Sequence, residues 1–180
     1  MQLAPYRWGM DFTTYARSMA AYNTWMNERI YALLADMPDE ARRRDLGAFF
    51  GSIHLTLNHI LLGDQAWMQR LRAQPVTMTS TRQVLHEGWD ELRAARAEMD
   101  KDIASWAAEV GQPFMDSVFR IWSVTYQRHL ELPGWAAVVQ MFNHQTHHRG
   151  QITTLMKQLG TDPGVTDFPW MPYFTAPQPA

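Results

Sequence analysis

Three histidines lie within five residues of one segment, at positions 144, 147 and 148. Neutral imidazole is the commonest protein ligand of divalent transition metals, so this spacing indicates metal chemistry. Residues four apart on an α-helix share one face. His144 and His148 can therefore grip one ion, as the paired histidines of helical zinc motifs do. Two ligands are rarely sufficient, so a third must come from elsewhere in the chain.

The helical face that carries His144 and His148 is otherwise apolar. It also contains Met141, Ile152, Leu155 and Leu159. Two histidines that interrupt such a stripe are predicted to point into the core. His147 instead shares a face with five polar residues, namely Gln140, Asn143, Gln151, Thr154 and Gln158. We therefore exclude His147 from the ligands.

His59 is the best candidate for the third ligand, because it shares a helical face with Leu55, Leu62 and Ala66. His54 falls on a more mixed face and is the weaker candidate, and neither His86 nor His129 has a partner at a ligand spacing. A second interpretation stays open at this point, in which these histidines are hydrogen-bonded core residues without a metal. A di-iron carboxylate centre is disfavoured, because the chain contains no Glu-x-x-His motif.

The composition limits the other possibilities. The chain of 180 residues contains no cysteine, which excludes disulfides, thiolate metal sites and a cysteine nucleophile. The net charge of -2, without a long basic run, makes nucleic acids and anionic membranes poor partners. We find no secretory leader in the opening residues and no apolar window long enough to span a membrane, so we expect a cytoplasmic protein. The length predicts one domain over residues 1–180.

Apolar residues recur at steps of three and four in four segments, which predicts an all-α fold, a four-helix bundle. The predicted helices are residues 11–37, residues 46–71, a third that begins with a capping box at Ser80 to Gln83 and ends before Gly111, and residues 133–160. Residues 114–130 lose this period and predict a short hairpin or extended crossover, in which residues 118–125 are rich in β-branched and aromatic side chains. The proline-rich tail from about residue 161 is expected to be extended.

These features together resemble the DinB/YfiT-like superfamily of metal-binding four-helix bundles, over nearly the whole chain. The matching segments are residues 21–27, residues 51–59 with Asp64 and Trp67, residues 143–151, and the ending at residues 160–167. The resemblance places the family's metal ligands on His59, His144 and His148. These are the three histidines that were selected above because they lie on apolar helical faces. The family name refers to DNA-damage induction and implies no DNA binding.

The resemblance implies one divalent ion, zinc or nickel, and a small-molecule substrate. Characterised relatives include transferases and isomerases that use low-molecular-weight thiols, and dimers are common among relatives, so a homodimer is expected. Alternatives are a hydrolase with Asp64 as a weak candidate for the general base, a non-catalytic metal-binding or stress-response protein, and an interaction module with an empty triad. Candidates for contacts behind the ligands are Asn23, Asn27, Asn58 and Asp64, although hydrogen bonds between helices would also explain them. Arg149 and Gln151 follow the triad and are candidates for contact with an anionic substrate, although an exposed face or a dimer seam explains them equally well.

Overall fold

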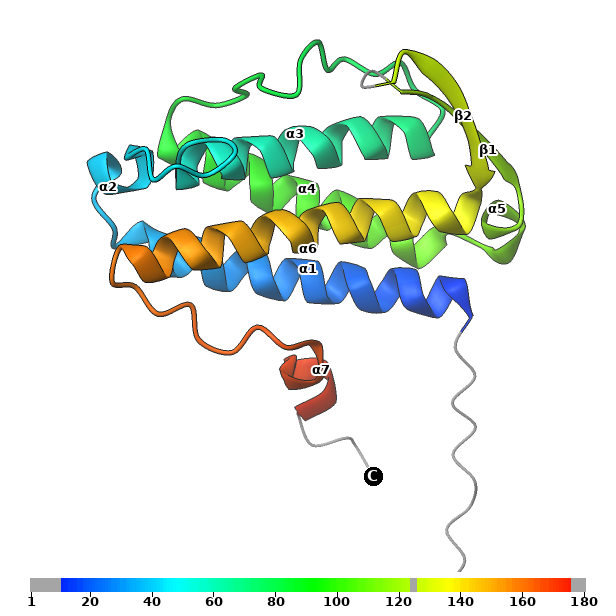
Figure 1. Cartoon of the computed structure of the whole chain (residues 1–180). Coiled ribbons are helices and arrows are strands. Elements are labelled where there is room, and N and C mark those ends of the chain that lie inside the picture. Colours follow the sequence, from blue (N-terminus) through cyan, green and yellow to red (C-terminus); the bar gives the residue numbers. More distant parts are fainter. Residues whose placement is uncertain (1–10, 124–125, 176–180) are drawn as a thin grey trace, which may run out of the picture.

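The computed structural model describes residues 11–123 and 126–175. Four long helices form a bundle in this part of the chain (Figure 1): α1 (Phe12–Ala35), α3 (Ile53–Leu71), α4 (Trp89–Glu109) and α6 (Gly134–Gln158). Both α1 and α3 pack against α4 and α6, so the helices form a closed ring around one core. The predicted all-α four-helix bundle is confirmed. None of the described helices has the length and apolar character needed to cross a lipid bilayer.

Local sequence sets the helix ends. The Asp11 carboxylate accepts a hydrogen bond from the Thr14 amide at 2.7 Å, and the Ser52 hydroxyl accepts one from the Leu55 amide at 3.2 Å. Both are N-cap interactions that satisfy otherwise free amides of the first turn. Beyond α6, Gly160 has a φ of 83°, the left-handed conformation that glycine adopts readily. Two shorter helices, α2 (Asp39–Arg43) and α5 (Gln112–Met115), lie in the connections.

A two-stranded antiparallel hairpin lies between α4 and α6, as predicted. Its strands are β1 (Val118–Ser123) and β2 (Arg128–Pro133), with Phe119 paired to Leu132. Residues 124–125, which the sequence assigns to this hairpin, lie outside the described residues. The opening residues used in the leader argument and the last five of the tail lie outside them as well.

The connection between α3 and α4 corrects the predicted start of the third helix. The capping box at Ser80 to Gln83 does not begin a helix, because Gln83 accepts from Thr79 and Ser80 accepts from the amide of Arg82, within a local turn. The helix α4 starts at Trp89, after Gly88. Figure 1 shows the reason: α3 and α4 run in the same direction, so residues 72–88 must cross the length of the bundle. We call this segment the crossing loop.

Two further boundaries differ from the prediction. The helix α3 begins at Ile53 rather than near residue 46, because the chain before it turns at Gly47 and Gly51, which have φ values of 74° and 81°. The tail contains a 3-10 turn, η1 (Phe168–Trp170), and a short helix, α7 (Pro172–Thr175), where an extended chain was expected.

A layer of buried polar residues separates two apolar clusters in the core. The first cluster includes Met26, Ile30, Leu57, Leu92 and Ile152, and the second includes Ala20, Met68, Ile103, Val138 and Phe142. The polar layer comes from all four long helices: Asn23, Asn27, Asp64, Arg96, Asp100, Gln145 and Arg149, each at most 5% exposed. Two members of this layer, Gln145 and Arg149, directly follow His144 and His148 on α6, so the layer and the histidines share the same turns of this helix.

Candidate metal centre

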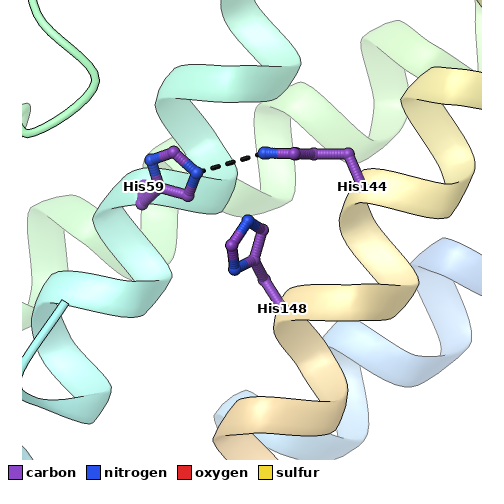
Figure 2. A group of neighbouring side chains, drawn as sticks. All are labelled: His59, His144 and His148. Carbon is purple, nitrogen blue, oxygen red and sulfur yellow. Dashed lines mark hydrogen bonds between the residues drawn. The ribbon is translucent and has the colours of Figure 1, made fainter. Parts of the chain in front are cut away.

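The three predicted histidines meet at the seam between α3 and α6. His59 projects from α3, and His144 and His148 project from successive turns of α6 (Figure 2). One ring nitrogen from each lies within 4.8 Å of the other two. The Nε2 atoms of His59 and His144 are 3.1 Å apart. Two nitrogens bound to one tetrahedral ion at about 2.1 Å lie roughly 3.4 Å from each other, so the triad fits a small divalent ion.

Hydrogen bonds fix the tautomer of two of the rings. His59 Nδ1 donates to the Thr81 carbonyl at 2.9 Å, and His148 Nδ1 donates to Gln151 Oε1 at 2.8 Å. Both acceptors are carbonyl oxygens, which cannot donate, so each Nδ1 carries the proton. Each Nε2 therefore carries the lone pair that a metal ion would take, and in this structure the lone pair of His59 Nε2 accepts from His144 Nε2. Such contacts behind the ligands are the usual means of orienting metal-binding histidines.

Neither Thr81 nor Gln151 was predicted in this role. Thr81 belongs to the crossing loop, 22 residues from His59, and it contributes a backbone carbonyl that no side-chain pattern reveals. The position of Gln151, three residues after His148, was visible in the sequence and is a helical contact distance. The third ring, His144, has a buried Nδ1 without a partner among the described residues.

Space for the His144 ring comes from Gly63. A methyl group built at Gly63 would lie 2.6 Å from His144 Cε1, closer than two such atoms can approach. The glycine on α3 therefore allows the ring from α6 to reach His59. The sequence indicated this position only as a glycine inside a helix, which often marks a close approach.

Gly63→Ala is expected to displace the His144 ring and to weaken zinc binding by about 10–100-fold, the range for a disturbed ligand orientation. Gly150→Ala is the matched control, because Gly150 is also inside a helix and a methyl group there has no neighbour within 4 Å. Competition with a chelating dye measures both affinities. Equal affinities for the two variants would show that His144 does not depend on the space at Gly63.

Burial keeps the triad neutral. It lowers the pKa of His59 to about 4 and that of His144 to about 3, and the pKa of His148 is lowered as well. A buried imidazole loses hydration of its charged form, and each ring also faces the others. At pH 7 each ring is therefore neutral, and no ring has to lose a positive charge before it binds a metal.

This predicts a metal affinity that is nearly constant between pH 8 and pH 6. Protons weaken binding only as the pH falls through the pKa values of the free ligands, which lie well below 6 for His59 and His144. Three ordinary histidines with pKa values near 6.5 would together lose roughly 60-fold over this interval. We expect a change of less than about threefold, measured by dye competition. A 60-fold loss would mean that the rings are not buried in solution.

An aromatic and a cationic side chain border the triad. The Phe50 ring stacks on His59 with a centroid distance of 3.9 Å. Arg82 lies in the crossing loop, directly after Thr81, and its guanidinium carbon is 5.7 Å from the Phe50 centroid. These residues line a cavity of about 40 Å³ beside His59, together with Leu55, Asn58, Thr81, Gln83 and Val84.

The other candidates from the sequence lie elsewhere. Asp64 is fully buried, and its carboxylate accepts from Arg96 and from Gln145. Asn23 and Asn27 donate to Asp100, so they bridge helices rather than contact the triad. Arg149 is buried and donates to Asn23, which corrects the expectation of an exposed residue.

Asn58 anchors the crossing loop. Its side-chain oxygen accepts from the amides of Leu85 and His86, at 3.0 Å each. His54 is also fully buried, and its Nε2 contacts the His86 carbonyl at 3.2 Å. His147 is exposed and His129 lies on the hairpin strand β2. The structure therefore brings together His59, His144 and His148 and leaves the remaining histidines outside the cluster.

Known proteins share both the sequence pattern and the fold. The sequence matches the DinB family over residues 10–179. It is 22% identical to Protein DinB of Bacillus subtilis (strain 168) over 164 residues, which cover 86% of this chain and 91% of that protein. The crystal structure of a DinB-like protein from Bacillus cereus ATCC 10987 superposes with a TM-score of 0.60 at 20% identity, over 79% of this chain and 91% of that one. The chain belongs to the DinB family.

Proposed function

We propose that this protein is a metal-dependent enzyme that activates a low-molecular-weight thiol for a transferase or isomerase reaction. The observation that carries the proposal is the convergence of three neutral imidazoles at a seam where His59 and His144 remain partly exposed. Three protein ligands leave a coordination position for a reactant. When bound, a zinc ion would supply the positive charge that keeps a thiol as its thiolate at neutral pH. Nickel is the second choice of metal.

The residues of the chain prepare this site before any reactant arrives. The Thr81 carbonyl and the Gln151 amide hold the protons of His59 and His148 on Nδ1, so that each Nε2 faces the centre. Phe50 covers one face of the His59 ring and keeps water from it. Gly63 leaves room for the His144 ring. The rings are thus fixed by neighbours from α3, α6 and the crossing loop.

The surroundings favour thiol chemistry over hydrolysis. Hydrolysis needs a general base beside the attacking water. Asp64, the only candidate from the sequence, is fully buried and paired with Arg96. The triad rings have no described carboxylate among their hydrogen-bond partners. A thiol has a pKa of about 8.5 and needs only a modest shift to ionise, so it does not require such a base.

The test starts from protein purified without a histidine tag, made metal-free and reloaded with zinc or nickel. A small thiol and 1-chloro-2,4-dinitrobenzene are the substrates. In this reaction the S–H bond breaks and its proton goes to solvent, while an S–C bond forms and chloride leaves with the bonding pair. We expect about one ion per chain and a rate at least ~100-fold above that of the metal-free protein.

Two results would contradict the proposal in different ways. Failure to bind any divalent ion would leave the triad as a group of hydrogen-bonded histidines. Binding of one ion without turnover of a panel of thiols and electrophiles, together with a lower melting temperature after metal removal, would show that the ion only joins α3 to α6.

A further inference from the structure

Arg82 is positioned as a recognition group beside the proposed reaction site. Its neighbour Thr81 accepts the His59 hydrogen bond, so the loop segment that fixes His59 also places Arg82. One guanidinium nitrogen donates to the Phe49 carbonyl at 3.3 Å. The group also lies over the Phe49 and Phe50 rings, at 5.1 and 5.7 Å. Arg82 and His59 line the same 40 Å³ cavity.

The charge around this cavity is not balanced within the described residues. Arg82 forms no ion pair there, and Glu87, on the same loop, pairs with Arg43. The acceptors behind the triad are a backbone carbonyl and an amide, which carry no charge. A divalent ion on three neutral ligands would add two positive charges next to the guanidinium. The site therefore calls for a ligand with more than one negative group.

The size and lining of the cavity narrow the chemistry of that ligand. A volume of about 40 Å³ exceeds what one water needs and suits a small group such as a carboxylate. Arginine binds carboxylates in a bidentate geometry. Apolar surface adjoins the cavity, since Phe49 is 67% exposed and Leu55 is 40% exposed. The surroundings fit a short carbon chain that ends in a carboxylate.

We propose that Arg82 binds the carboxylate of the substrate thiol, with the carboxylate in the cavity beside Phe50 and the sulfur toward His59, His144 and His148. The preferred thiols are thus small mercapto acids or larger thiols with a carboxylate near the sulfur. This inference rests on the proposed function and specifies the class of thiol that the site accepts.

Binding of thiols to the cobalt(II)-loaded protein tests it without turnover. A thiolate bound to cobalt(II) gives a sulfur-to-metal absorption band in the near ultraviolet. We expect 3-mercaptopropionate to bind about tenfold tighter than its methyl ester, as suits one charge-assisted contact. Arg82→Gln should reduce this ratio to below about twofold while it retains one cobalt per chain. Arg93→Gln, which removes an exposed arginine of α4 and changes the net charge equally, should keep the ratio.

A measurement on the unmodified protein guards against a misfolded variant. An electrostatic preference for the acid should shrink as sodium chloride rises from about 20 to 500 mM, because salt screens exposed charges. Equal affinities for the acid and its ester, or an unchanged ratio in Arg82→Gln, would overturn the role of Arg82 and leave thiol binding intact. Absence of cobalt binding, or of any thiol band, would overturn this inference together with the proposed function.

Discussion

Replacement of His148 with alanine is expected to weaken zinc binding by more than ~100-fold and to abolish the metal-dependent transfer of thiols. Loss of a residue that merely orients a ligand costs about 10–100-fold, so loss of a ligand itself should cost more. The variant would keep two imidazoles, one on each helix, and two ligands are too few to hold the ion. Elemental analysis after dialysis gives the ion content per chain, and the dinitrobenzene assay gives the rate.

His147→Ala is the matched control for this prediction. It removes the adjacent histidine, whose side chain is exposed and whose nitrogen contacts Gln151 at 3.3 Å without joining the cluster. This variant should keep about one ion per chain. If both variants lost the ion equally, or if His148→Ala kept it, the ligand set would have to be reassigned within 144–148.

The long helices and the histidine cluster were predictable because both depend on periodicity. An apolar stripe of period 3.6 fixes which face of α6 is buried, and His144 and His148 lie on that face. The buried face of α3 was predicted less well, because Leu55, on the face of His59, is 40% exposed. His54, assigned to a mixed face, is fully buried. The burial of His54 arises from the crossing loop, whose His86 carbonyl contacts its ring.

The crossing loop itself could not be read from local signals. Ser80 and Gln83 match a capping box, yet their side chains bond within a turn, as such residues also do outside helices. The loop is long because α3 and α4 are parallel, which is a property of the topology. Its position against Asn58 and His59 joins residues 22 to 28 apart in the sequence. Thr81 and Arg82 consequently became candidates only in the folded protein.

The sequence also did not reveal that the residues of the buried polar layer contact one another. Asp64, Arg96 and Gln145 come from three helices, 32 and 81 residues apart from Asp64, so no spacing within one helix reveals their contacts. From the sequence, Asp64 was a candidate for a contact behind the ligands or for a general base, and Arg96 and Gln145 were not singled out. Together they balance charge in the core, where the Asp64 carboxylate accepts from both Arg96 and Gln145.

A large loss of stability is expected on substitution of Arg96, which belongs to this layer. Its guanidinium contacts Asp64 Oδ2 at 2.5 Å and Asp100 Oδ1 at 2.8 Å. Arg96→Met keeps the apolar stem and removes the charge, so both carboxylates lose their buried cation. Such a change costs about 3–5 kcal/mol of unfolding free energy, a large part of the 5–15 kcal/mol typical of a domain. Urea denaturation of the metal-free proteins at pH 7 measures it.

Arg72→Met is the matched control, because Arg72 forms an ion pair with Asp102 in which both side chains are about a third exposed. An exposed pair of this kind contributes about 0–1 kcal/mol. The two substitutions remove the same chemical group, and they differ in burial. Similar losses of stability would contradict the assignment of Arg96 to a buried pair in solution.

The pH dependence of the Arg96→Met effect separates a lost charge from lost packing. Burial raises the pKa of Asp100 to about 6 even with Arg96 present, and removal of the cation should raise it further. A folded-state pKa above the unfolded value of 3.8 gives stability that is complete below pH 3.8 and is lost as the pH rises through the folded pKa. The variant should therefore recover part of its deficit relative to the unmodified protein between pH 7 and pH 5, since a protonated Asp100 no longer needs a cation. A deficit that stays constant over this interval would mean that the loss comes from the missing hydrogen bonds and contacts of the guanidinium group, and not from an unbalanced charge at Asp100.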